Sequence, residues 1–206
     1  MARELAKNLK AHKITFVSGP ELRHRHVGSS EANIRKLFEE AELHQEKYGK
    51  ASPLHVVILD EFDSIGSRDS DDNTGVTSRM INQLLAKMDG LQELNNILLF
   101  GLTNRMDKID SALLRPGRFE VHLNIALPDE AARREILAIH TKRLVTCGAW
   151  PNNPAIDQEI IKLTQGKSGA QIESIVKTAL TNALMRDTVN ISIGWEDIYL
   201  ALQELP

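Results

Sequence analysis

Short apolar runs alternate with helical patterns from the start of the chain to Pro128. The runs have the length and composition of buried strands: Ile14–Ser18, Leu54–Asp60, Ile97–Thr103 and Val121–Leu127. Between them, apolar residues recur every three or four positions in Glu31–Tyr48 and Val76–Met88, as on the buried face of a helix. Because this alternation is typical of a parallel sheet covered by helices, the sequence predicts a Rossmann-like α/β fold for this part.

After Pro128 the strand patterns end and only helical patterns follow. They cover Asp129–Leu144, Ala155–Thr164, Ser168–Asp187 and Trp195–Leu202. A loop with Gly148, Pro151 and Pro154 separates the first two. We therefore expect an α/β unit in residues 1–128 and an all-helical unit in residues 129–206.

The first ten residues are amphipathic and basic, a character that transit peptides share. Glu4 and the absence of serine favour a structural helix instead. Leu5 and Leu9 are one turn apart, so we expect them to form a face that packs inward.

Composition limits the function classes. The 206 residues are 42% hydrophobic and 26% charged, enough for a real core, and the net charge of −3 gives no broad reason to bind nucleic acid or an anionic membrane. Cys147 is the single cysteine, which excludes an internal disulfide and suits a reducing compartment. The apolar runs are too short for a transmembrane segment. We expect a cytoplasmic protein with no nucleic-acid partner.

Two adjacent carboxylates, Asp60 and Glu61, directly follow an apolar strand. At the carboxyl end of a parallel strand, one such acid can hold Mg²⁺ while the other orients an attacking water. A strand that merely enters a polar turn gives the same pattern, so these two residues alone leave both interpretations open.

Polar residues after the next strand favour the catalytic interpretation. Asn104 follows Ile97–Thr103, and its amide could polarise a water against a phosphate. Arg115 and Arg118 lie shortly afterwards, and guanidinium groups are suited to phosphate oxygens.

These motifs, in this order, resemble the AAA ATPases. Phrases such as Ser30-Glu-Ala-Asn-Ile-Arg35 and Leu94-Asn-Asn-Ile97 are most similar to the first ATPase domain of the vesicle-fusing ATPases, the N-ethylmaleimide-sensitive fusion factors. The resemblance implies that Asp60 binds the metal, Glu61 is the base, Asn104 is sensor 1, and Arg115 and Arg118 reach a neighbouring subunit. It also implies that residues 1–128 bind the nucleotide and that residues 129–206 form a helical lid, from which His140, Gly169 and Ala170 flank the nucleotide. Asp89 and Gly90 would signal between subunits. For Asp89 and Gly90, a helix C-terminal turn with a left-handed glycine is a sufficient explanation by itself.

What the resemblance implies for function is hydrolysis of ATP with Mg²⁺ in a homohexamer. The energy would drive disassembly of SNARE complexes, through an adaptor protein, in vesicle fusion and intracellular protein transport. Membrane association would be peripheral and only through partners.

One departure from the family is the absence of any Gly-x-x-x-x-Gly-Lys-Ser/Thr loop to cradle phosphates. The residues after Met1 resemble the helix that follows such a loop. We therefore expect a catalytically incomplete piece, without the strand that would lie between Ile97–Thr103 and Val121–Leu127. The alternatives are a non-catalytic AAA-like scaffold that begins at Met1, and an unfoldase like cell division cycle protein 48.

The second departure lies in the predicted central-pore loop, where His26 occupies a position that is usually aromatic before Val27 and Gly28. We hypothesise that this loop grips a threaded polypeptide; a basic surface turn is the alternative. Residues 67–75 would be the second pore-facing loop. Their calcium-loop spacing lacks the required glycine and the bidentate glutamate, which excludes calcium.

Overall fold

The computed structural model describes residues 2–22, 29–67, 75–90 and 94–204. The chain divides into two compact units, residues 1–122 and 123–206. The division falls close to Pro128, inside a segment that contains no helix or strand. That the first unit binds nucleotide and the second covers it stays a prediction.

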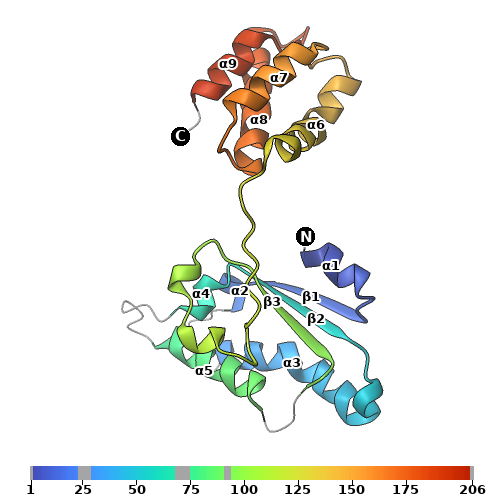
Figure 1. Ribbon diagram of the computed structural model, residues 1–206, viewed down its shortest axis with the longest axis vertical. Coiled ribbons are helices and arrows are strands. Elements are labelled where there is room, and N and C mark those ends of the chain that lie inside the picture. The colour runs from blue at the N-terminus through green and yellow to red at the C-terminus, as the bar shows by residue number, and fades with distance from the viewer. Residues whose placement is uncertain (1, 23–28, 68–74, 91–93, 205–206) are drawn as a thin grey trace. The chain divides into compact units, whose positions relative to one another are not determined.

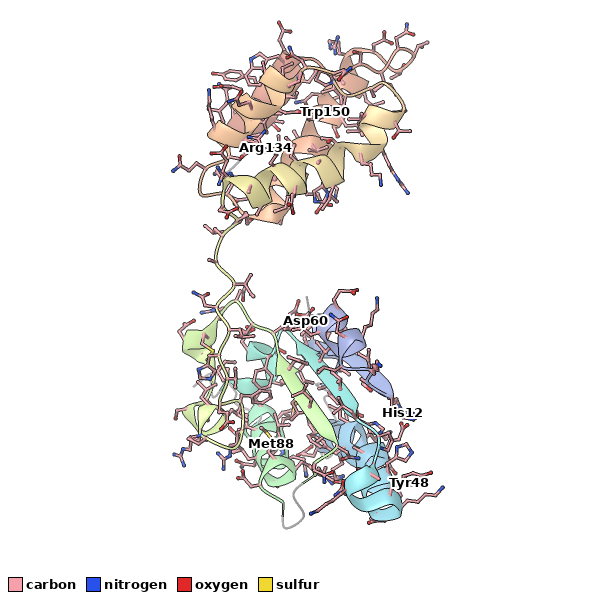
Figure 2. All side chains as sticks on the ribbon, turned by 45° about the vertical axis from the view of Figure 1, so that its right-hand side comes forward. His12, Tyr48, Asp60, Met88, Arg134 and Trp150 are labelled. Atoms are coloured by element: carbon pink, nitrogen blue, oxygen red, sulfur yellow. The ribbon has the colours of Figure 1, made fainter. Side chains whose placement is uncertain are left out.

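In the first unit, the described strands form a parallel sheet in the order β1-β2-β3 (Figure 1). Strand β1 is Lys13–Ser18, β2 is His55–Asp60 and β3 is Ile97–Gly101. These strands confirm the first three predicted from the apolar runs. Because parallel strands run the same way, Asp60 lies at the carboxyl end of the sheet and His12 at the opposite end (Figure 2).

The prediction of a strand at Val121–Leu127 is wrong, since these residues form no strand. Its alternating aliphatic side chains are exposed instead, with Val121 at 75% and Leu123 at 71%. An apolar run becomes a strand only when a neighbour takes up its backbone hydrogen bonds. Among the described residues, β3 pairs with β2 on one side and no strand occupies its other side.

The two faces of β2 contribute to different clusters. Val57 and Leu59 belong to the larger core, with side chains from helices α3 (Ser29–Tyr48) and α5 (Val76–Met88). Val56 and Ile58, which alternate with them, pack with Ala6 of helix α1 (Ala2–Asn8). This period of two is the expected pattern for a strand with both faces covered.

Helix α1 does not pack as predicted. Leu5 and Leu9 are exposed, at 39% and 49%, while Ala6 is fully buried. Successive residues of a helix point about 100° apart, so turning Ala6 toward the sheet turns the Leu5–Leu9 face away. The prediction that this leucine face packs inward is wrong.

The longer helices of the first unit confirm the periodic patterns, and α5 begins and ends at the predicted residues. Several shorter elements were not predicted because one turn is too short to show a period. They are α2 (Gly19–Leu22), α4 (Asp63–Gly66), and the 3₁₀ turns η1 (Gly49–Ala51), η2 (Met106–Lys108) and η3 (Ser111–Leu114).

The second unit is all-helical in its described residues, as predicted. Its helices are α6 (Glu130–Thr146), α7 (Pro154–Leu163), α8 (Gly169–Arg186) and α9 (Trp195–Gln203). They enclose a separate core whose fully buried members include Ile160, Ile172 and Ile198. Within the described residues, no helix combines the length and the apolar character that crossing a bilayer requires.

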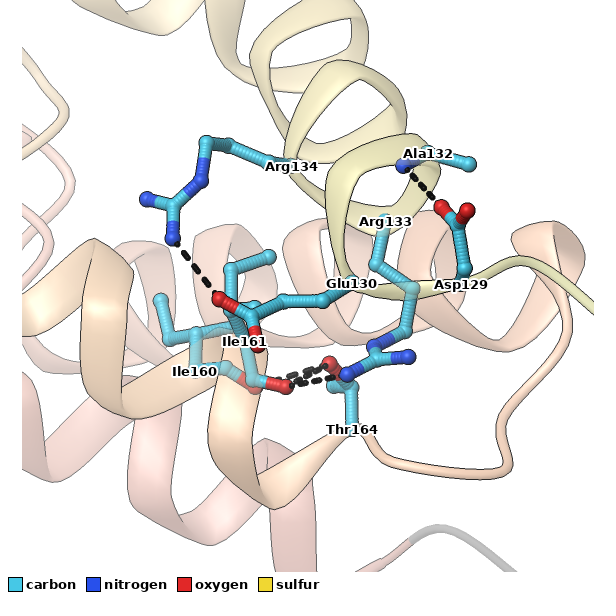
Figure 3. Close-up of polar contacts among 8 residues, drawn as sticks. All are labelled: Asp129, Glu130, Ala132, Arg133, Arg134, Ile160, Ile161 and Thr164. Carbon is cyan, nitrogen blue, oxygen red and sulfur yellow. Dashed lines mark hydrogen bonds and ion pairs between the residues drawn. The ribbon is translucent and has the colours of Figure 1, made fainter.

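Polar contacts fix the start of α6 (Figure 3). Asp129 caps the helix, its carboxylate accepting the N–H of Ala132 at 2.8 Å. Arg133 is 7% exposed and donates to the carbonyl oxygen of Pro128 at 3.2 Å. It also donates to the carbonyl oxygen of Ile161 at 3.2 Å (Figure 3). Because Ile161 lies on α7, this buried guanidinium ties the entry of α6 to the neighbouring helix.

Candidate functional site

The carboxyl end of β2 presents the two predicted catalytic carboxylates. Asp60 is the last residue of the strand, and its Oδ1 accepts the backbone N–H of Glu61 at 3.0 Å. Glu61 is exposed and has a φ of 49°, in the left-handed region that residues with a side chain seldom adopt. Such backbone strain is found more often at functional sites than elsewhere.

Gly19, just after β1, makes the close approach that this turn requires. A Cβ at position 19 would lie 2.7 Å from the carbonyl oxygen of Glu61 and 2.1 Å from Oγ of Ser64. Any larger residue would push against the backbone of Glu61. The glycine therefore lets the ends of β1 and β2 lie together.

The end of β3 joins this turn through hydrogen bonds. The N–H of Phe62 donates to the carbonyl of Leu102 at 2.9 Å, and the Thr103 hydroxyl donates to the Asp63 carboxylate at 2.7 Å. Asn104, the next residue, is exposed. The structure thus brings Asp60, Glu61 and Asn104 to adjacent strand ends, where Glu61 and Asn104 are exposed and Asp60 is half-buried.

Arg118 and Asp89, predicted to have separate roles, form an ion pair. Nε of Arg118 donates to Oδ1 of Asp89 at 2.8 Å, and Nη2 donates to Oδ2. The third guanidinium nitrogen, Nη1, donates to the carbonyl of Ala112. This two-point geometry fixes the plane of the guanidinium as well as its position. Sequence reasoning missed the contact because the two residues are 29 positions apart.

The hydrogen bonds from Arg118, together with its charge, lower the pKa of Asp89 below the ordinary value for an aspartate. We expect the substitution Arg118→Gln to raise the pKa of Asp89 toward that value, measured by a carboxyl-carbon NMR titration. Arg115→Gln, at an exposed neighbouring arginine, is the matched control and should leave the Asp89 pKa unchanged. An Asp89 pKa that is equal in the wild-type chain and in Arg118→Gln would contradict the pairing.

The same shift fixes the sign of a pH effect on stability. Because the folded-state pKa of Asp89 is depressed, the pair stabilises the fold above the unfolded aspartate pKa of about 3.9. That contribution is lost as the pH falls through the lower, folded-state value. The stability difference between the wild-type chain and Arg118→Gln should therefore shrink below about pH 4.

Gly90 corrects one detail of the predicted turn after α5. Asp89 is the C-cap of that helix, and its N–H donates to the carbonyl of Leu85 at 2.8 Å. Gly90 follows, but it does not belong to the residues with positive φ. The prediction of a left-handed glycine here is wrong, because the capping hydrogen bond forms without one.

Three predicted nucleotide-flanking residues lie in the helical unit. His140 is on α6, and Gly169 and Ala170 open α8 after the capping box of Ser168. A Cβ at Gly169 would lie 3.4 Å from Ile136, one turn before His140, so this glycine lies at the α6–α8 contact. The predicted pore-loop residues His26, Val27 and Gly28 lie outside the described residues.

The chemistry of this strand-end site suits Mg²⁺ at Asp60. Mg²⁺ is commonly held by one or two carboxylates together with waters and substrate phosphates. Asp60 offers hard oxygen ligands there, even with one oxygen accepting from Glu61. No glycine-rich phosphate loop occurs in the sequence, and the described strand ends offer two carboxylates and one amide.

Comparison with known proteins gives consistent matches. Residues 1–127 match the family described as "ATPase family associated with various cellular activities (AAA)". The whole chain is 43% identical to part of the vesicular-fusion protein sec18 of Schizosaccharomyces pombe and 44% identical to part of the vesicle-fusing ATPase of Arabidopsis thaliana. For 94% of the chain, identity to SEC18 of Saccharomyces cerevisiae is 48%. The matched regions make up 28%, 29% and 26% of these three relatives.

Proposed function

This chain belongs to the AAA family of ATPases, and we propose that the protein of which it forms part hydrolyses ATP to remodel protein complexes. The observation that carries the proposal is the turn at the carboxyl end of the sheet. There Asp60 and Glu61 leave β2 beside Asn104, which follows β3. These residue types at adjacent parallel-strand ends are suited to activating a water beside a phosphate.

In this proposal each residue has a distinct task. Asp60 holds the metal, Glu61 accepts the proton of the attacking water, and Asn104 orients that water through its amide. When bound, ATP supplies the phosphoryl group and Mg²⁺ neutralises part of its charge. The exposure of Glu61 and Asn104 leaves both side chains accessible to the water they would act on.

Arg115 and Arg118 would act on the nucleotide of a neighbouring subunit in a homohexamer. Arg115 is exposed, whereas Arg118 is held by Asp89. For Arg118 to reach a phosphate, its ion pair with Asp89 must open. The pairing supports a role for Asp89 and Gly90 in signalling between subunits, since a movement at the end of α5 would change the position of Arg118.

The remaining roles rest on the family. His140, Gly169 and Ala170 would flank the nucleotide, and His26, Val27 and Gly28 would line the pore. Relatives are named vesicle-fusing ATPase and vesicular-fusion protein. We therefore propose a cytoplasmic enzyme that acts with an adaptor on SNARE complexes, with membranes reached only through those partners.

ATP turnover by the whole protein tests the proposal. We expect Asn104→Ala to reduce turnover at least about tenfold, because the attacking water loses its orienting amide. Asn95→Ala replaces an exposed asparagine at the other end of β3 and should leave turnover unchanged. Absence of ATP hydrolysis in the wild-type protein, or equal rates in Asn104→Ala, would contradict the assigned function.

A non-catalytic AAA-like binding module is the second candidate. The observation that favours it is the absence of a phosphate loop from the sequence. Calorimetry of the whole protein with Mg-ATP separates the two: an enzyme binds and turns over nucleotide, whereas a scaffold without the loop does neither.

A further inference from the structure

A cluster of imidazole and carboxylate groups lies at the end of the sheet opposite the proposed hydrolytic residues. It contains His12, Glu40 and His44, each with a ligand atom within 4.8 Å of the others. His12 lies far along the sheet from Asp60 (Figure 2). Among the described residues, these three are the His, Cys, Asp or Glu side chains whose ligand atoms lie close enough together to hold one metal ion.

Secondary structure places these three residues together. Glu40 and His44 are four residues apart on α3, so they share one face of the helix. His12 comes from the segment before β1, where its N–H donates to the carbonyl of Leu54 at 2.8 Å. The ligand atoms are therefore carried by a long helix and a backbone segment tied to the sheet, rather than by a free loop.

A fourth residue, His55, is buried beneath the cluster and contacts His44. It is the first residue of β2, only 4% exposed, and its Nε2 lies 2.9 Å from Nδ1 of His44. This hydrogen bond engages Nδ1 of His44 and leaves Nε2 of His44 to bind a metal ion. Such a contact from behind orients the imidazole and is a usual companion of metal-binding histidines.

We propose that His12, Glu40 and His44 bind a transition-metal dication, with Zn²⁺ as the fitting ion. Two imidazoles and one carboxylate form a ligand set that zinc uses, with water in the fourth position. Imidazole nitrogen disfavours Mg²⁺ and Ca²⁺, which prefer oxygen ligands. Ligand atoms bound to one zinc ion lie roughly 3.4 Å apart, given bond lengths of about 2.0–2.1 Å. Exposed side chains such as His12 can close the remaining distance by rotation.

Lys13 competes with the ion for Glu40. Its ammonium group contacts Oε2 of Glu40, and both side chains are partly exposed. Zn²⁺ binding would displace this lysine, so the lysine weakens the site without blocking it. The bound ion would link the C-terminal half of α3 to the start of β1, and would therefore stabilise the first unit in proportion to its occupancy.

The test is calorimetry of the untagged 206-residue chain with ZnCl₂, in the Cys147→Ser background, because Cys147 is an exposed free thiol that could bind zinc. We expect one ion per chain, with affinity at least about tenfold weaker in His12→Ala and in His44→Gln. His122→Ala removes a histidine outside the cluster and should bind like the parent. Lys13→Gln should bind more tightly.

Thermal unfolding gives a second readout. ZnCl₂ should raise the midpoint of the parent and of His122→Ala but not that of His12→Ala, whose exposed position allows the variant to fold. Visible absorption of bound Co²⁺ should show four-coordinate bands that disappear with His12→Ala. Zinc binding that survives both His12→Ala and His44→Gln, or no binding by the parent chain, would overturn the proposal.

Discussion

Replacing Glu61 by glutamine is expected to reduce ATP hydrolysis by the whole protein at least about a hundredfold while nucleotide binding is retained. Glutamine has nearly the same shape but cannot accept the proton of the attacking water. The local backbone should not change, because Glu61 is held through its N–H to Asp60 and its carbonyl to Ser64. Steady-state turnover and calorimetric nucleotide affinity measure the two effects separately.

The matched control is Glu39→Gln, which removes an exposed carboxylate of α3 away from the strand ends. It should leave turnover unchanged. Mixed assemblies provide a further check, since we expect Arg118→Ala to lose turnover as well. Glu61→Gln subunits retain Arg118 and Arg118→Ala subunits retain Glu61, so mixing the two variants should restore part of the activity. Turnover of Glu61→Gln at the wild-type rate would show that another group is the base.

Replacing Phe38 by alanine should lower the free energy of unfolding of the first unit by about 3–5 kcal/mol. Phe38 lies on α3, is 1% exposed and belongs to the same buried cluster as Leu59 and Phe62. Removing its ring leaves a cavity in the core of the first unit. Since whole domains are stable by about 5–15 kcal/mol, this is a large fraction.

Tryptophan fluorescence and circular dichroism distinguish unfolding of the first unit from unfolding of the second. Both tryptophans, Trp150 and Trp195, lie in residues 123–206, so their fluorescence reports on the helical unit, whereas circular dichroism reports on both. Urea titration of Phe38→Ala should shift a dichroism transition to lower urea. Leu43→Ala on the same helix, where Leu43 is 58% exposed, should change stability by less than about 0.5 kcal/mol. Equal losses in the two variants would contradict the assignment of Phe38 to the core.

Periodic patterns predicted the long elements well because local sequence largely determines them. The apolar stripe of Val76–Met88 becomes α5 without change at either end, and its Met80, Ile81 and Leu84 are buried. Val121–Leu127 shows the opposite case. Its alternation is that of a strand, but a strand also needs a hydrogen-bonding neighbour, and no local pattern supplies one.

The candidate site could be predicted where its residues adjoin a strand, and its contacts could not be predicted where residues meet across the fold. Asp60 and Glu61 stand at the end of an apolar run, which is what made them candidates. The Thr103 hydroxyl on Asp63 and the guanidinium of Arg118 on Asp89 join residues 40 and 29 positions apart. In the proposed metal site, only the helical spacing of Glu40 and His44 is visible in the sequence, since His12 comes from another element.

The left-handed backbone of Glu61 sets its proposed catalytic role against thermostability. Holding a residue with a Cβ in that region is unfavourable by roughly 1–2 kcal/mol, and glycine would relieve it. An engineer who ranked substitutions by stability alone would therefore favour Glu61→Gly and would obtain a sturdier protein without its proposed base. Any programme to stabilise this domain has to exempt that position from optimisation.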